Sequence, residues 1–128
     1  MTVAKVTFTR RDLHGVRELI REVAERAGLG NRRRNHLVIA ANEAAVNAIE
    51  HGGGAGCLDV IQEGGRRLII EVSDHGPGLP APVDVRRPDP SASHGRGLWL
   101  IHQTCDHVEI MSRPEGTTIR LHMLIRAG

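Results

Sequence analysis

The stretch Asn42-Glu43-Ala-Ala-Val-Asn47-Ala-Ile-Glu50-His51 is the part of this sequence that constrains its fold and function most. Its composition is strongly helical, and a spacing of four residues places Glu43 and Asn47 one turn apart on one helix face. An asparagine carbonyl oxygen is a suitable ligand for Mg²⁺. A glutamate one turn earlier can polarise a hydroxyl or a water molecule. Taken alone, the pair is better explained as exposed polar residues of an amphipathic helix.

The apolar periodicity on either side of this helix predicts a single α+β domain over residues 1–128. Helices are expected after the N-cap residue Asp12, over residues 32–51, and from about Gly97. Adjacent strands joined by tight turns indicate a mixed, mostly antiparallel sheet covered by helices on one face, which is a two-layer α/β sandwich. The expected strands are Thr2–Phe8, Cys57–Ile61, Leu68–Val72, Val108–Met111 and Thr117–Ile125.

Composition excludes several classes of function. Only Phe8 and Trp99 are aromatic, so the core must be aliphatic and stacking of single-stranded bases is disfavoured. A net charge of +2 is too small to indicate a nucleic-acid partner. No apolar run approaches the ~20 residues of a membrane span, and the N-terminus does not resemble a signal peptide, so a cytoplasmic protein is expected. The eight histidines show neither HExxH nor paired zinc spacing, which indicates no role in metal binding.

Two glycine-rich motifs add chemistry to the helix. Asp74-His-Gly76-Pro-Gly78 follows an apolar strand, and a carboxylate there can accept a hydrogen bond from an exocyclic amine such as adenine N6. Its glycines let the backbone pass close to a flat ring. Gly95-Arg96-Gly97-Leu98 opens a helix, whose free N–H groups form an anion site. Each motif alone also fits an ordinary glycine-containing turn. Neither a complete GxGxxG nor a Walker A motif occurs.

In order and spacing, the set resembles the GHKL (Bergerat-fold) ATPase superfamily. Glu43-x-x-x-Asn47 is similar to its N box, and Asp74-x-Gly76-x-Gly78 is similar to its G1 motif. Gly95-x-Gly97-Leu98 resembles G2, and Gly116-Thr117 resembles the last motif. Within the superfamily the chain most resembles the anti-sigma factor serine kinases, the RsbW-like branch. That likeness extends to Gly97–Ile101 and to Cys105–Ile110.

The resemblance implies ATP and Mg²⁺ as cofactors and assigns roles to residues. Asn47 would coordinate Mg²⁺, Asp74 would bind adenine N6, and Glu43 would be the general base for a protein serine hydroxyl. Residues 79–94, which are rich in proline and contain no lysine, would form the ATP lid, with phosphate contacts from Arg86, Arg87, Arg96 or the backbone. The remaining nucleotide-binding residues would be Gly76, Gly78, Leu79, Gly95, Arg96, Gly97, Leu98 and Thr117.

The resemblance also implies protein partners. The expected partners are an anti-anti-sigma (STAS-like) protein, which would be phosphorylated, and a sigma factor. The first helix and the lid would contact them, with Arg17, Arg21 and Arg32–Arg34 as candidates, and the N-terminal strand could join two copies in a homodimer. Two alternatives stay open: a non-catalytic module whose partner affinity is gated by ATP, and a detached catalytic domain of a sensor histidine kinase.

Overall fold

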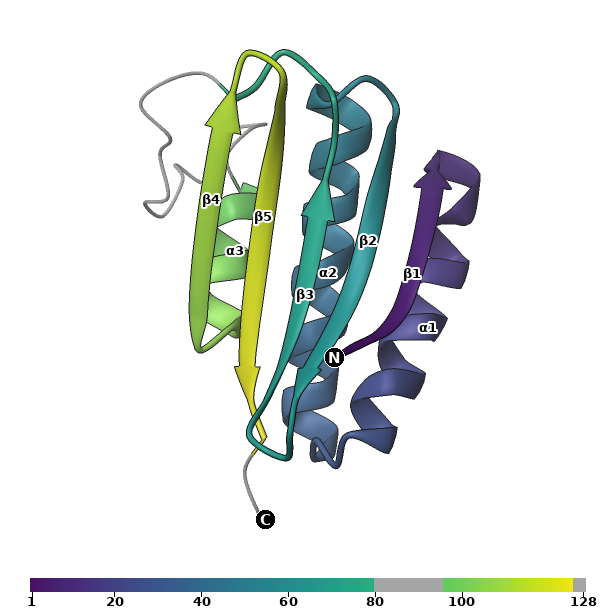
Figure 1. Cartoon of the computed structure of the whole chain (residues 1–128), viewed down its shortest axis with the longest axis vertical. Coiled ribbons are helices and arrows are strands. Elements are labelled where there is room, and N and C mark those ends of the chain that lie inside the picture. Colours follow the sequence, from purple (N-terminus) through teal and green to yellow (C-terminus); the bar gives the residue numbers. More distant parts are fainter. Residues whose placement is uncertain (80–95, 126–128) are drawn as a thin grey trace.

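The computed structural model describes residues 1–79 and 96–125 (Figure 1). The predicted order of strands and helices is confirmed, and their bounds differ from the predicted ones by only a few residues. The elements are β1 (Thr2–Thr9), a short 3-10 turn (Arg10–Asp12), α1 (Leu13–Arg26), α2 (Asn31–His51), β2 (Ala55–Glu63), β3 (Arg67–Ser73), α3 (Arg96–Thr104), β4 (His107–Arg113) and β5 (Gly116–Leu124).

The five strands form one sheet in the order β1-β2-β3-β5-β4. Each neighbouring pair is antiparallel, so the described strands contain no parallel pair and the sheet is not mixed. The three α-helices lie side by side on one face of the sheet, with α2 between α1 and α3 (Figure 1). The predicted fold class, an α+β two-layer sandwich with helices on one face of the sheet, is confirmed.

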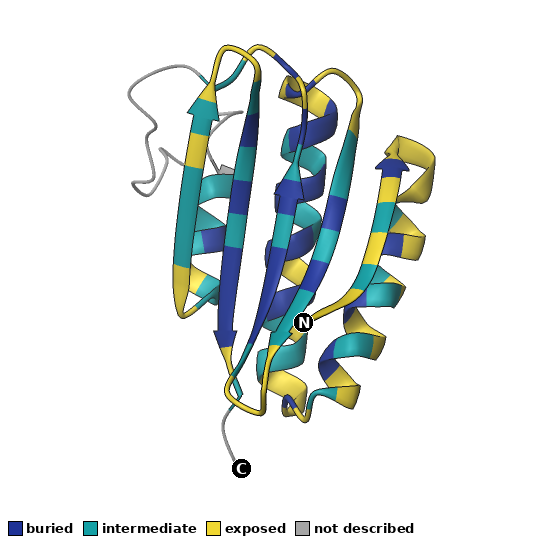
Figure 2. Ribbon diagram, viewed as in Figure 1, coloured by how far each residue is buried: buried dark blue, intermediate teal, exposed yellow. Residues whose placement is uncertain are grey.

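The core lies between the sheet and the helices, and α2 contributes the largest share of it. Helix α2 buries a row of alanines (Ala40, Ala41, Ala44, Ala45 and Ala48), and these small side chains let the helix pack closely on the strands. Buried residues alternate along β2 and along most of β5, as expected for strands with one face against helices (Figure 2). His122 breaks the alternation on β5, because it is buried between Leu121 and Met123. Phe8 is the only aromatic residue of the described core, which is otherwise aliphatic as predicted.

Asp12 precedes α1, as the N-cap prediction requires, but its side chain does not cap that helix. Its Oδ2 instead accepts hydrogen bonds from Thr9 N at 2.9 Å and from Thr9 Oγ1 at 3.2 Å. The reason is the 3-10 turn between β1 and α1, which directs the carboxylate back to the end of the strand. Asp12 therefore fixes the chain reversal that brings α1 onto the sheet.

The basic triplet at the start of α2 is partly structural. Arg33 forms an ion pair with Asp106 and donates a hydrogen bond to Leu124 O at 2.7 Å, which fastens α2 to the end of β5. On the neighbouring helix, Arg17 donates to Asn42 and Arg21 donates to Asn35, each at 3.0 Å. These arginines thus connect elements within the fold. Among the described helices, none is long and apolar enough to cross a membrane.

Candidate functional site

The predicted motifs meet at one end of the sheet, the upper end in Figure 1. Helix α2 and strand β3 both end there, and β5 begins there. This placement follows from topology, because β3 and β5 are antiparallel neighbours and Ser73 at the end of β3 pairs with Thr118 near the start of β5. Residues 74–79 leave β3 at this end and therefore pass between α2 and the β4–β5 hairpin.

Asp74 is the buried polar group at this end, with 9% of its surface exposed. Its Oδ1 accepts hydrogen bonds from Gly76 N at 2.9 Å and from Thr117 N at 3.2 Å. Its own backbone N–H donates to Thr117 O at 2.9 Å. Because both amides donate to Oδ1, the carboxylate is held in one orientation and Oδ2 is directed toward Gly52.

Three glycines near Asp74 lie so close to neighbouring atoms that a side chain at any of the three positions would overlap them. A Cβ added at Gly52 would overlap the Asp74 carboxylate, and one at Gly76 would overlap the backbone of Gly52. Gly116 has a positive φ of 155°, and a Cβ there would overlap Asp74 O. The end of α2 therefore packs backbone against backbone on the segment after β3. The helix expected over residues 32–51 ends just before Gly52, and the sequence alone indicates no further role for this glycine.

A second connection anchors Leu79, the first residue of the predicted lid. Leu79 N donates to Ser112 Oγ at 2.7 Å, and Ser112 Oγ lies 3.0 Å from Thr117 Oγ1. Gly78 has a φ of 88°, and a Cβ there would overlap Arg113 O, so the chain runs tightly along the β4–β5 hairpin. Ser112 was missed by sequence analysis, since a single serine in a strand belongs to no motif.

Glu43 lies beside the start of α3. A Cβ added at Gly97 would be 3.0 Å from Glu43 Oε2, so the glycine is what lets the carboxylate approach the helix terminus. Partial burial, followed by repulsion from Glu50, raises the pKa of Glu43 above its usual value. A raised pKa makes this carboxylate a stronger base than an exposed glutamate.

Of the other predicted site residues, some lie within the described part of the chain and some lie outside it. Asn47 is half-buried on α2, one turn beyond Glu43 and before Gly52. Leu98 packs against the core from α3, and its carbonyl oxygen lies 2.9 Å from His102 Nδ1. Gly95, the side chain of Arg96 and lid residues 80–94 lie outside the described residues. The predicted residues that the structure brings together are thus Asp74, Gly76, Gly78, Leu79 and Thr117 on one side and Glu43 with Gly97 on the other.

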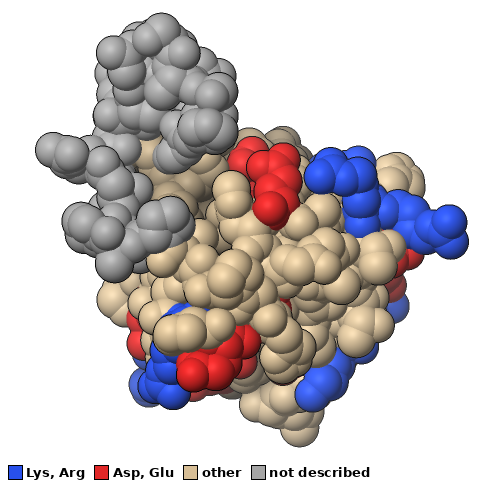
Figure 3. Space-filling model, turned by 90° about the horizontal axis from the view of Figure 1, so that it is seen from above, with Lys and Arg blue, Asp and Glu red and all other residues tan. Residues whose placement is uncertain are grey.

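Seen from this end of the molecule, the middle of the described surface carries mainly uncharged side chains (Figure 3). Lysine and arginine side chains lie toward its rim, and acidic side chains form small groups. A polyphosphate bound here would therefore meet backbone N–H groups, such as those that begin α3, rather than a dense patch of described basic side chains.

Comparison with known proteins identifies the family. The sequence profile of the histidine kinase-like ATPase domain matches residues 6–123, and the chain belongs to this family. The predicted membership of the GHKL superfamily is confirmed, and the chain is an ATP-binding module of that type. No curated protein matches the chain.

Solved structures share the fold at low sequence identity. The RsbU and RsbW domains of Rv1364c from Mycobacterium tuberculosis match with a TM-score of 0.70 and 20% identity, over 98% of this chain and 34% of that one. The histidine kinase domain of a blue-light activated histidine kinase from Erythrobacter litoralis matches with a TM-score of 0.60 and 15% identity, over 94% of this chain and 69% of that one. The catalytic domain of histidine kinase ThkA, in a nucleotide-free form, matches with a TM-score of 0.57 and 15% identity, over 95% of this chain and 96% of that one. The chain thus spans about a third of the first of these structures.

Proposed function

We propose that this protein is an ATP- and Mg²⁺-dependent protein serine kinase of the anti-sigma type. It would phosphorylate an anti-anti-sigma (STAS-like) partner and hold a sigma factor in an alternative complex. The observation that carries the proposal is the position of Glu43, whose partly buried carboxylate lies beside Gly97 at the start of α3. Its helix also carries Asn47 and ends at Gly52 against Asp74, so base, metal ligand and adenine-binding group would share one rigid support.

Asp74 would select adenine. Its Oδ1 is occupied by the amides of Gly76 and Thr117, so Oδ2, beside Gly52, would be the oxygen left to accept a hydrogen bond from the exocyclic amine. Guanine presents a carbonyl acceptor at the equivalent position of its ring, which a carboxylate would repel. Only glycine fits at positions 52 and 76, because their backbones pack closely. No side chain at these two positions would therefore obstruct a flat ring. We therefore expect ATP and ADP to bind and GTP not to bind.

The donor chemistry of α2 suits Mg²⁺. This ion prefers hard oxygen ligands and keeps several waters while contacting substrate phosphates. Asn47 would supply a carboxamide oxygen, and bound Mg²⁺ would neutralise phosphate charge. Glu43, one turn earlier, would accept the proton of the attacking serine hydroxyl. Gly76, Gly78, Leu79, Gly95, Arg96, Gly97, Leu98 and Thr117 would line the nucleotide, with residues 79–94 as its lid.

The partner assignment rests on the RsbW-like sequence features and on the fold shared with a structure that contains an RsbW domain. The contact surface would be the exposed face of α1 with the lid. Arg17, Arg21 and Arg33 are engaged within the fold, so Arg32, exposed at the start of α2, is the best candidate of the predicted arginines. Strand β1 is an edge strand of the sheet, which makes it suitable for pairing with a second copy in a homodimer.

Phosphoryl transfer and ATP binding can be tested separately. The full chain would be incubated with γ-labelled ATP, Mg²⁺ and a STAS-like protein encoded near it. We expect Glu43→Gln to abolish transfer while ATP still raises the thermal unfolding midpoint. Asp74→Asn should lose ATP binding, yet remain folded because its carboxamide oxygen can still accept both amide hydrogen bonds. Glu63→Gln, at the exposed end of β2 and away from both Asp74 and α1, is the matched control and should behave as the wild type.

The outcomes separate the alternatives. Tight ATP binding that depends on Asp74, with no phosphoserine formed by the wild type, would replace the kinase by an ATP-gated binding module. Transfer to a histidine of an added dimerisation domain would instead indicate a detached histidine-kinase catalytic domain. Equal transfer by wild type and Glu43→Gln would remove Glu43 from the mechanism.

A further inference from the structure

Three side chains with metal-binding atoms converge on the face of the sheet opposite the helices. His107 and Glu109 belong to β4, and His122 belongs to β5. Their donor atoms all lie within 4.8 Å of one another. His107 is exposed, Glu109 is half-buried, and His122 is buried at 6% exposure. The cluster is therefore reachable from solvent on one side and fixed by the protein on the other.

The backbone of the sheet accounts for this convergence. Alternate residues of a strand face the same side, so His107 and Glu109 project together while Val108 packs toward the core. In the β4–β5 register, His107 pairs directly with His122. Side chains paired across strands lie close together, and the diagonal neighbour Glu109 is within reach of a histidine. Indeed, His122 Nε2 lies 2.6 Å from Glu109 Oε1, and the two imidazole rings have centroids 5.1 Å apart.

We propose that His107, Glu109 and His122 bind a divalent transition-metal ion of the Zn²⁺ class. Two imidazoles and one carboxylate suit this class rather than Mg²⁺ or Ca²⁺, which prefer oxygen ligands alone. Zinc lies ~2.0–2.2 Å from nitrogen and oxygen ligands, which places tetrahedral ligand atoms roughly 3.3 Å from one another. Donor atoms within 4.8 Å need only small shifts to reach that spacing, and His122 Nε2 and Glu109 Oε1, at 2.6 Å, would move slightly apart. The exposed His107 can make such a shift. Three protein ligands leave a fourth position for water or for a group of another molecule.

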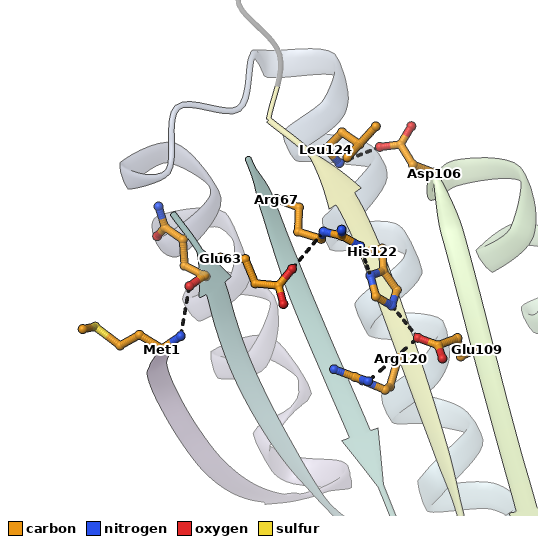
Figure 4. A network of polar contacts seen from close by, with 9 residues as sticks. Met1, Glu63, Arg67, Asp106, Glu109, Arg120, His122 and Leu124 are labelled. Carbon is orange, nitrogen blue, oxygen red and sulfur yellow. Dashed lines mark hydrogen bonds and ion pairs between the residues drawn. The ribbon is translucent and has the colours of Figure 1, made fainter. Parts of the chain in front are cut away.

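The surroundings of the cluster are compatible with a bound cation. Two arginines lie nearby, but each has its own carboxylate. Arg67 Nε is 2.9 Å from Glu63 Oε1 (Figure 4), and Arg120 Nε is 3.1 Å from Glu71 Oε2. Arg120 Nη1 is 3.9 Å from Glu109, a longer ion pair that a metal ion would replace. The positive charge beside the cluster is therefore largely offset by Glu63 and Glu71.

The hydrogen bonds of His122 define what metal binding must change. Arg67 Nη1 lies 3.2 Å from His122 Nδ1 and can only donate, so Nδ1 accepts and the ring proton is on Nε2, where it is donated to Glu109. A metal ion on Nε2 would require the ring proton on Nδ1 instead, and Arg67 would then have to turn away from the ring. Glu109 would exchange its hydrogen bond from His122 for the metal ion.

This site is separate from the one proposed for ATP. His107 begins β4 and His122 lies near the end of β5, whereas Gly116 at the start of β5 contacts Asp74. The two sites therefore lie toward opposite ends of the same strand. Moreover, α2, which carries Glu43 and Asn47, covers the other face of the sheet (Figure 1).

The test is titration of the nucleotide-free full chain with ZnCl₂ by calorimetry and with CoCl₂ by visible absorption. We expect one ion per chain and the absorption bands of tetrahedral cobalt. His107→Ala and Glu109→Gln each change a side chain that is at least partly exposed, so both variants should fold. Each should weaken binding at least about tenfold, a loss seen even when a residue that only supports a ligand is removed. Zn²⁺ should also raise the unfolding midpoint of the wild type and not that of Glu109→Gln.

His14→Ala removes an exposed histidine of α1 and is the matched control, which should bind Zn²⁺ as the wild type does. The proposal is overturned if the wild type shows no stoichiometric binding, or if His107→Ala and Glu109→Gln bind as tightly as the wild type. It is also overturned if His14→Ala weakens binding as much as they do, because the ion would then be shared among surface histidines. None of these outcomes depends on ATP binding or kinase activity.

Discussion

Polar groups are concentrated in two regions of the molecule. One is the end of the sheet around Asp74, called the sheet end, and the other is the face of the sheet opposite the helices around His122, called the open face. The polar groups are held in different ways in the two regions. At the sheet end, a carboxylate is held by backbone amides, and glycine backbones approach it so closely that no Cβ fits. On the open face, the contacts join charged or polar side chains of neighbouring strands, with Glu71, Arg120 and Glu109 in adjacent register positions. One region is defined by shape and the other by charge.

The difference has consequences for how each region responds to change. Steric packing of backbones is insensitive to salt and cannot relax around an added atom. Ion pairs between partly exposed side chains are screened by salt, and each contributes little by itself. Added side-chain atoms at the sheet end should therefore lower the stability of the protein by an amount that does not depend on salt. Changes of charge on the open face should alter stability by an amount that salt reduces.

Gly76→Ala is expected to have the largest effect. The added Cβ would overlap the backbone of Gly52, and neither backbone segment can move without displacing Asp74 or the end of α2. Overpacking of this kind costs about 1–3 kcal/mol. Chemical denaturation should show that loss in the free energy of unfolding, and the loss should be the same at low and high salt.

Gly15→Ala is the control for the previous variant. Gly15 lies in the exposed part of α1, and a Cβ there would have no neighbour within 4 Å. Alanine is the better helix former, so this change should stabilise the protein by about 0.5–1 kcal/mol. If the two alanine variants shift stability in the same direction, shape does not define the sheet end.

The two regions also differ in how far the sequence reveals them. Glu43 and Asn47 share one helix, and Asp74, Gly76 and Gly78 share one loop, so short-range spacing alone makes these groups visible. The same spacing cannot show that Gly52 packs against Gly76 or that Ser112 accepts a hydrogen bond from Leu79. Both contacts depend on how α2 and the β4–β5 hairpin meet in three dimensions.

The cluster on the open face was not foreseen from the sequence. His107 and His122 fit no short metal-binding spacing, and the prediction from sequence was that no histidine has a role in metal binding. Only the register of β4 against β5 brings them together, and register is set by the hairpin at Arg113–Gly116. The fold itself was predictable, since apolar periodicity and turn residues act locally.

Arg120→Gln tests the charge side of the comparison, with a smaller expected effect. Arg120 pairs with Glu71 on β3 and with Glu109 on β4, so its loss leaves two carboxylates without this cation. A cross-strand charge pair contributes roughly 0.2–1 kcal/mol, and the destabilisation should lie in that range. It should shrink at about 1 M salt, where the screening length is only ~3 Å. A destabilisation that is unchanged by salt would show that packing of the arginine stem, and not its charge, is what counts.

Glu43→Gln is expected to give the smallest change in the free energy of unfolding. Removing this charge at the sheet end should stabilise the protein, whereas removing the charge of Arg120 on the open face should destabilise it. Burial first and Glu50 second raise the pKa of Glu43 in the folded protein, so folding disfavours its ionised form. Below the unfolded pKa both states are protonated, and the variant should match the wild type. As the pH rises from there through the raised folded pKa, the wild type should become the less stable of the two.

The effect is small because Glu43 is only partly buried and solvent screens its charge. Unfolding followed from acidic to neutral pH would measure it, and Glu50→Gln should reduce it by removing the second cause of the raised pKa. A wild type that is more stable than Glu43→Gln at neutral pH would mean that a favourable partner, such as the N-terminus of α3, outweighs burial. Glu43 would then be too weak a base for the proposed transfer, which makes this modest stability measurement a check on the mechanism as well.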